Sequence, residues 1–194
     1  MWKRLYKRLV TDQGREVIRP PEATITAALR QAEGELRVRF PASYKAFIRQ
    51  FGPGELAGFF RVYGPTVPGC RDYGNNIVKD NREWRDPRGA WADEGDPDLV
   101  ARLIVFCTTG GGDAFFWDPA DVRDARRREY GIYILSRGSM EMEVEEAAGS
   151  FKEFIELICL GDGFPPLVGA EGWGEDGPRQ CFYSTWRTRK VARR

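Results

Sequence analysis

Two stretches near the N-terminal end repeat apolar side chains at the spacing of an amphipathic helix. They cover residues 22–37 and 41–51. Pro41 suits the first position of the second helix, and Gly52-Pro53 ends that helix. The apolar positions are Ile25, Ala28, Leu29, Ala32 and Leu36 in the first stretch, and Tyr44, Phe47, Ile48 and Phe51 in the second.

A third predicted helix begins at Ser150, where Glu153 three residues later completes a capping-box pattern. Gly161 ends this helix, and Pro165-Pro166 predicts that it does not resume. The apolar stripe of the helix consists of Phe151, Phe154, Ile155 and Ile158.

Between these helices the pattern is typical of strands. Residues 54–65, GELAGFFRVYGP, predict one strand, and four more are predicted at 103–107, 114–117, 131–135 and 140–146. In the last of these, apolar residues alternate with glutamates, which predicts a half-buried strand with one acidic face. The glutamates of that face are Glu141, Glu143 and Glu145.

The segment Thr108 to Asp113 contains three consecutive glycines and raises the question of a phosphate-binding loop. Such a loop joins a strand to a helix, whose N-terminus supplies free N–H groups, and a Walker loop also carries a lysine. Here Asp113 and the strand-like AFFW follow the glycines, and there is no lysine. The segment is therefore predicted to connect two antiparallel strands.

Composition restricts the chemistry further. The 194 residues carry a net charge of +1 and contain no histidine, which excludes a Ser-His-Asp catalyst and His-ligated metals in this chain. No two of the four cysteines form a CxxC pair, and Cys107 and Cys159 lie within apolar runs that predict core positions. We expect no cofactor and no metal.

The N-terminus lacks the pattern of a signal peptide, and no run of about 18 apolar residues is present. We therefore expect a cytoplasmic protein without a membrane-spanning segment.

Together the pattern predicts an α+β fold, with a mostly antiparallel sheet of about four to six strands flanked by helices at its N-terminal and C-terminal ends. We expect one domain over residues 22–161. A basic leader, residues 1–21, is expected to pack on it or to serve as an arm for a membrane or nucleic acid. An extension, residues 162–194, packs on the domain or trails from it.

The order of these elements resembles the SUKH superfamily, the Smi/Knr-like cell-wall-assembly-regulator domain. FPASYKAFIRQFG resembles the second helix of that family, LIVFCTTGGGDAFFWDP resembles its strand, Gly-Gly-Asp, strand hairpin, and SFKEFIELI is similar to its closing helix. The family usually has Asn-Gly-Gly after the second helix, where this chain has Gly52-Pro53-Gly54, and the connection from Thr66 to Arg102 is long.

The resemblance implies a protein-binding module without catalytic activity, because many bacterial members of the family are, or resemble, immunity proteins that neutralise a cognate polymorphic toxin. Inhibition of a basic toxin would need an acidic, partly aromatic face. Two candidate surfaces have that character. The glutamates of the first also fit a solvated strand face, and the tryptophans of the second also fit core packing. The two surfaces are the strand face formed by Glu141, Glu143 and Glu145, and the connection that carries Trp84, Trp91, Asp93, Glu94 and Asp96.

Two other classes of function stay open. Basic residues interleaved with aromatic ones at both termini suit nucleic-acid binding or a scaffold or regulatory role, although the low net charge means that nucleic-acid binding would require a segregated patch. A carboxylate-dependent hydrolase would use Asp113, Asp118 or the glutamate row, but both aspartates also fit turn positions.

Overall fold

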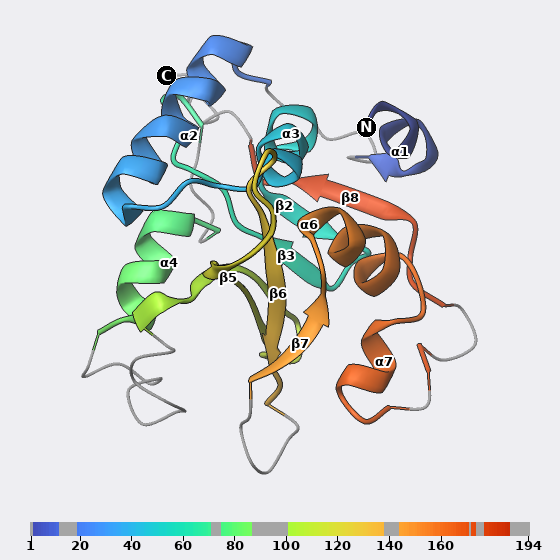
Figure 1. The fold of residues 1–194 in the computed structure, drawn as a ribbon. Coiled ribbons are helices and arrows are strands. Elements are labelled where there is room, and N and C mark those ends of the chain that lie inside the picture. Colours follow the sequence, from blue (N-terminus) through green and yellow to red (C-terminus); the bar gives the residue numbers. More distant parts are fainter. Residues whose placement is uncertain are drawn as a thin grey trace.

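The structure is a computed structural model that describes residues 2–11, 19–70, 75–86, 101–137, 144–170, 172–173 and 177–186. Within this part of the chain, an eight-stranded sheet has the order β1-β8-β2-β3-β4-β5-β6-β7 (Figure 1). The β1–β8 pair is parallel, and the other neighbouring pairs are antiparallel. The strands are β1 Val10–Thr11, β2 Gly54–Leu56, β3 Phe60–Val62, β4 Ile104–Thr109, β5 Ala114–Asp124, β6 Glu129–Leu135, β7 Val144–Ala148 and β8 Cys181–Ser184.

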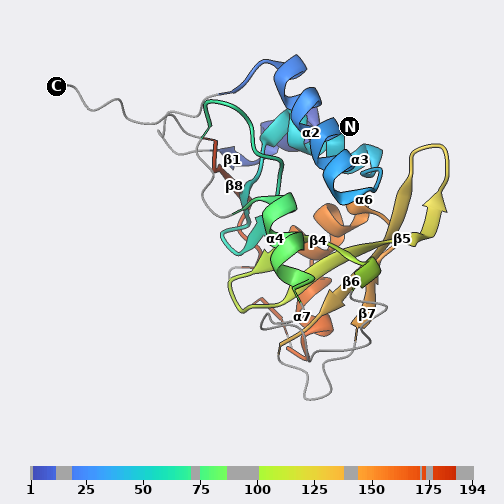
Figure 2. The same ribbon diagram turned by 90° about the vertical axis from the view of Figure 1, so that its left-hand side faces the viewer.

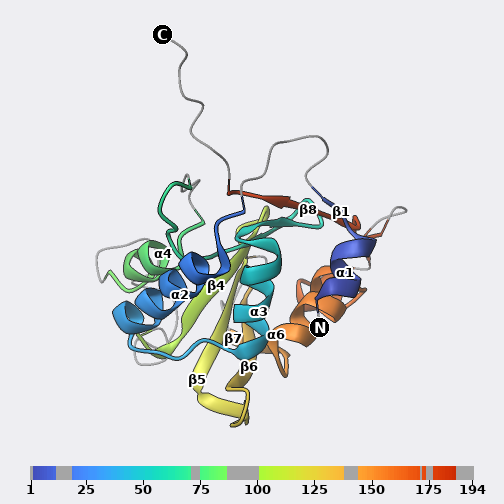
Figure 3. The same cartoon turned by 90° about the horizontal axis from the view of Figure 1, so that it is seen from above.

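Helices precede and follow the central strands in the chain. Seen from above, α2 and α4 lie together on one side of α3, and α1 lies on its other side (Figure 3). The α+β class and the mostly antiparallel sheet are confirmed, although the sheet has more strands than the four to six predicted. The helices are α1 Lys3–Arg8, α2 Glu22–Leu36, α3 Ala42–Phe51, α4 Ile77–Trp84, α6 Phe151–Glu153, the π-helix η1 Phe154–Cys159 and α7 Phe164–Leu167.

Residues 54–65 form a hairpin, so the prediction of one strand was wrong. Leu56 of β2 pairs with Phe60 of β3 around a tight turn in which Ala57 and Gly58 have φ values of 57° and 71°. Glycine adopts such angles freely, but an alanine rarely does. The turn therefore lies inside an apolar run whose residue types favour a continuous strand.

The tri-glycine segment is the turn between β4 and β5, as the sequence predicts. Thr109 N–H donates to the carbonyl of Asp113 at 2.9 Å, and Gly112 has a φ of 97°. β5 continues to Asp124, beyond the predicted end at Trp117, because an irregularity in the β5–β6 register accommodates Pro119.

The core is an aromatic layer between the sheet and the helices α3, α6 and η1. The Trp117 ring of β5 stacks on Phe106 at 4.8 Å and meets the Tyr44 ring of α3 at 5.0 Å. Phe151 and Phe154 cover Phe106 at 5.5 and 5.1 Å. Each such ring pair adds about 0.5–1.5 kcal/mol beyond the area that it buries.

Cys107 and Cys159 are fully buried, as predicted. Burial raises the pKa of both thiols well above the usual value, so neither is a ready nucleophile.

The β5–β6 hairpin reaches the start of α3 and caps it (Figure 2). The Glu129 carboxylate accepts hydrogen bonds from the Ser43 amide at 2.9 Å and from its hydroxyl at 2.6 Å. The amide of Ala42 donates to the carbonyl of Arg127 at 3.0 Å. An acidic group at this position satisfies the unpaired N–H groups of the helix and complements its dipole.

Both terminal segments are attached to the domain. Trp2 is buried and donates its indole N–H to the carbonyl of Ser43 at 2.9 Å, which supports the packing alternative for the basic leader. The extension supplies β8, which pairs with β2 on one side and β1 on the other. Residues far apart in the sequence thus complete one edge of the sheet.

The third predicted helix begins as expected. The Ser150 hydroxyl accepts from the Glu153 amide at 3.2 Å, while the Glu153 carboxylate accepts from the Gly149 amide at 2.9 Å. The helix then widens into η1. The expectation that it does not resume after Pro165-Pro166 was wrong, because these prolines occupy the first turn of α7, where their missing N–H groups are not needed.

We predict that Gly54→Ala destabilises the protein by about 2–3 kcal/mol, because the added methyl overlaps the Tyr183 carbonyl oxygen between β2 and β8. Urea unfolding measures the change. Gly34→Ala in α2 is the matched control: its methyl meets no atom within 4 Å, so helix propensity should raise stability by about 0.5–1 kcal/mol. Equal effects of the two substitutions would contradict a tightly packed β2–β8 edge.

Candidate functional site

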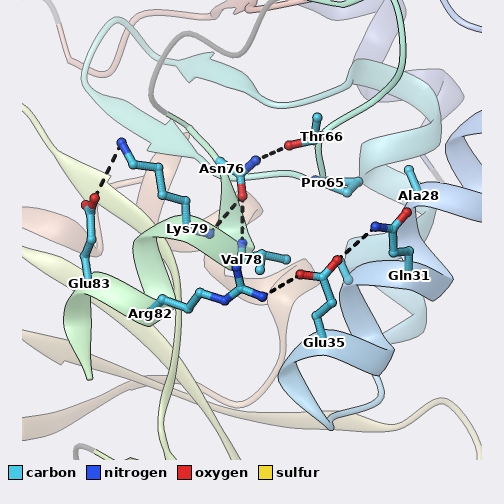
Figure 4. A pocket seen from close by; sticks show the side chains of 11 residues that line it. Ala28, Gln31, Glu35, Pro65, Thr66, Asn76, Val78, Lys79, Arg82 and Glu83 are labelled. Carbon is cyan, nitrogen blue, oxygen red and sulfur yellow. Dashed lines mark hydrogen bonds and ion pairs between the residues drawn. The ribbon is translucent and has the colours of Figure 1, made fainter. Parts of the chain in front are cut away.

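A cleft of ≈ 560 Å³ lies between α2 and α4 (Figure 4). Both helices and the chain segments that lead into α4 contribute to it, including described parts of the long connection that the sequence indicates as a functional region. The lining residues are Ala28, Gln31, Ala32, Glu35, Pro65, Thr66, Asn76, Val78, Lys79, Arg82 and Glu83.

The floor of the cleft is apolar because α2 places two small side chains there. Ala28 and Ala32 are one helical turn apart and buried, and Pro65 and Val78 lie near them. Longer side chains at the two alanine positions would fill the space between the helices, so the small residues keep the cleft open.

A carboxylate and a guanidinium connect the two walls. Arg82 of α4 pairs with Glu35 of α2 at 2.8 Å, and Gln31 donates to the other oxygen of the same carboxylate at 2.9 Å (Figure 4). Lys79 and Glu83 form a second pair along α4 at 3.5 Å, and both are well exposed. The rim thus carries both signs of charge.

The first turn of α4 is held by Asn76. Its side-chain oxygen accepts from the amides of Val78 and Lys79 at 3.0 and 2.9 Å, the usual arrangement of an N-cap. Its amide nitrogen donates to the Thr66 hydroxyl. One residue therefore joins the helix to the segment that borders the cleft.

The fully buried Asn81 ties α4 to the sheet. Its side chain accepts from the Val105 amide at 2.9 Å and donates to the Val105 carbonyl at 2.8 Å, so it pairs with β4 as a strand backbone would. It also donates to the carbonyl of Ile77. β3 ends at Val62, the Tyr63 amide still donates to the Phe106 carbonyl, and the Asn81 side chain satisfies both backbone groups of Val105.

Most of the residues predicted to bind a partner lie outside the described residues: Trp91, Asp93, Glu94, Asp96, Glu141 and Glu143. Trp84 is buried and its ring packs on Phe116 at 4.6 Å, so the alternative of core packing holds for this tryptophan. Glu145 lies in β7 and is exposed. The structure thus brings none of the described candidates into the cleft.

Both aspartates considered for hydrolysis have structural partners. Asp118 accepts from the guanidinium of Arg102 at 2.8 and 2.9 Å and from the Ala120 amide at 2.8 Å, which is the predicted Asx-type turn. Asp113 is buried, and it accepts from the Thr109 hydroxyl at 2.6 Å and the Arg137 amide at 3.1 Å. These bonds fix the ends of the β4–β5 hairpin.

The described residues offer neither a metal-binding cluster nor a membrane-spanning helix. They contain no group of three or more acidic or cysteine side chains placed to hold a metal ion. No helix in the same part of the chain is long and apolar enough to cross a membrane.

The cleft lining was not predicted from the sequence. Gln31 and Glu35 are polar residues one helical turn apart on an amphipathic helix, and a solvated helix face is built in the same way. Only their position opposite Arg82 distinguishes them, and that position depends on the fold.

Comparison with known families decides what kind of domain this is. The model of the SMI1 / KNR4 family (SUKH-1) matches residues 26–157, well over half of the chain. The chain belongs to the SMI1 / KNR4 family (SUKH-1). No curated protein matches it in sequence. In this SUKH-1 protein, α4, the cleft and all of α2 from residue 26 onward fall within the matched residues, whereas β1 and β8 fall outside them.

We predict that Asn81→Ala lowers the free energy of unfolding by about 2–4 kcal/mol, because it leaves the buried amide and carbonyl of Val105 without partners. Chemical denaturation gives the value. Arg82→Ala on the exposed side of the same helix should cost less than about 1 kcal/mol. A small loss at Asn81 would mean that α4 is not anchored through this amide.

Proposed function

We propose that this SUKH-1 protein is a non-catalytic protein-binding domain, that it acts as an immunity protein for a cognate toxin, and that the partner binds at the α2–α4 cleft. Family membership supports a domain of the SUKH type. The observation that carries the proposal is the cleft itself, with small apolar side chains at its floor and fixed charges of both signs around it.

That arrangement corresponds to a common form of protein interface. The centre of an interface is depleted in charge, while its rim is polar and often charged. Ala28 and Ala32 would receive a protruding apolar side chain of the partner, and Lys79 and Glu83 would meet groups of opposite charge. Fixed charges of this kind favour the correct partner and speed its association.

The environment of the two aspartates supports the absence of catalysis. A general base needs an oxygen free to accept a proton from substrate or water. Asp113 and Asp118 are buried, which restricts access of substrate and water, and their oxygens already accept hydrogen bonds from Thr109 and Arg137 and from Arg102, respectively. A second candidate surface is the acidic strand. Its Glu145 is exposed, so the residues of this strand belong in the same tests of toxin binding.

The proposal is tested with the toxin that copurifies with the chain from its source. The purified chain should abolish that toxin's activity at a 1:1 ratio and restore growth of cells that express it. The chain alone should leave phosphodiester and glycoside substrates intact. A tight partner whose activity is unaffected, or hydrolysis that disappears in Asp113→Asn, would refute the immunity role.

We expect the double charge swap Lys79→Glu/Glu83→Lys to slow association with the toxin by about tenfold at low salt, because it inverts the rim pattern. Stopped-flow or surface-binding kinetics measure the rate. The swap keeps the net charge and the pairing along the helix.

Lys152→Glu/Glu156→Lys is the matched control, since this pair has the same spacing and lies on α6 and η1, away from the cleft. It should leave the rate unchanged. Equal slowing by both swaps, or by neither, would exclude the cleft as the interface. Slowing by Glu141→Lys/Glu143→Lys in its place would assign binding to the acidic strand.

A further inference from the structure

A second hollow of ≈ 320 Å³ lies among α1, α2, α3 and the end of β8, separate from the cleft. We call it the basic pocket. Its lining draws on both terminal segments of the chain as well as on the SUKH-1 domain. The described lining residues are Lys3, Arg19, Pro20, Glu22, Ile25, Ala46, Arg49, Gln50, Phe51 and Trp186.

The floor of the basic pocket is apolar and rigid. Ile25, Phe51 and Trp186 are each almost completely buried. The Trp186 ring packs directly over Gly52, where an added Cβ would lie 2.7 Å from the ring. The indole is therefore closely packed against the backbone at Gly52.

Two guanidinium groups at the rim are held by neutral partners. Arg49 donates through Nε to the Thr26 hydroxyl at 3.3 Å. The Arg19 guanidinium lies over the Tyr6 ring, 4.6 Å from its centroid. These contacts orient the two side chains without neutralising their charge.

Three arginines elsewhere in the protein are held by carboxylates instead. Arg82, Arg102 and Arg123 each pair with a carboxylate at 2.8 Å. In the described part of the chain, no carboxylate forms an ion pair with Arg19, Arg49 or Lys3, and Glu22 is the one acidic residue among the described lining. Like charges gathered around an apolar floor repel one another, and a bound anion removes that cost.

We propose that the basic pocket binds a small organic anion, a phosphate monoester on a flat body, of which a nucleoside monophosphate is the simplest representative. The planar fork of an arginine suits two phosphate oxygens, and two such forks with Lys3 would surround the group. The apolar floor would contact the flat body. A volume near 320 Å³ lies at the small end of the range of ligand pockets, about 300–1,000 Å³.

Adenosine monophosphate is the first probe, with inorganic phosphate and a ten-residue oligothymidine as the other arms. Calorimetry at low salt should show one site for the nucleotide, and inorganic phosphate should bind at least tenfold more weakly because it lacks the flat body. At tenfold the dissociation constant, the nucleotide should raise the melting temperature by about 3–5 °C.

Arg49→Gln and Arg19→Gln should each weaken nucleotide binding at least tenfold. Arg126→Gln, an exposed arginine in the β5–β6 turn, is the matched control and should bind as the unmodified protein does. Melting curves without ligand check that each variant folds, and the exposed Arg19 keeps the test usable if Arg49→Gln unfolds.

Three results would overturn the proposal. They are no binding of the nucleotide, equal weakening in the pocket variants and the Arg126 control, and binding of the oligonucleotide alone. The last result would identify a nucleic-acid surface in place of a small-molecule pocket. None of these outcomes involves the toxin. The immunity role can therefore be refuted while nucleotide binding is confirmed, and nucleotide binding can be refuted while the immunity role is confirmed.

Discussion

The anchoring of α4 to the edge of β4 is the constraint on which the cleft depends. The aromatic layer around Trp117 holds α3, α6 and η1 firmly, but α2 and α4 lie at its margin. α4 is a short helix, and its contacts to the sheet include the Trp84 ring and the buried amide of Asn81. A short helix has little stability of its own. Its position opposite α2 therefore depends on directional hydrogen bonds as well as on apolar packing.

This division between apolar core and polar anchoring explains why a cleft exists at all. Two helices that met through large apolar side chains would exclude a space between them. Here small residues on α2 face α4, and an ion pair between Glu35 and Arg82 spans the opening. The small side chains thus leave space between the two walls, while Asn81 and Trp84 hold α4 in place. A surface fixed in this way loses little conformational entropy on binding, which favours both affinity and selectivity.

Elements that depend on local residue patterns were predictable from the sequence. The apolar stripe of α3, the tri-glycine turn and the capping box at Ser150 each follow from a few neighbouring side chains. The β2–β3 turn was not predictable, because it depends on an alanine in the left-handed region. β8 was missed as well, since its four residues become a strand only beside β1 and β2.

The sites were harder to predict than the fold because they combine distant segments. Asn81 serves as a substitute strand partner only because β3, whose last residue Val62 pairs with Cys107, does not reach Val105. Arg49 and Trp186 are 137 positions apart by number (186 minus 49), yet they line one hollow. The basic character of both termini was visible in the sequence, but the neutral partners that orient Arg19 and Arg49 were not.

Native-state hydrogen exchange at the Val105 amide tests the anchoring of α4 most directly. If Asn81 holds the helix as a strand would, this amide exchanges only through global unfolding, as slowly as the amides in the centre of β5. If the Val105 amide and the α4 amides instead exchange together, several orders of magnitude faster, then α4 opens on its own. The cleft would then not be a preformed surface.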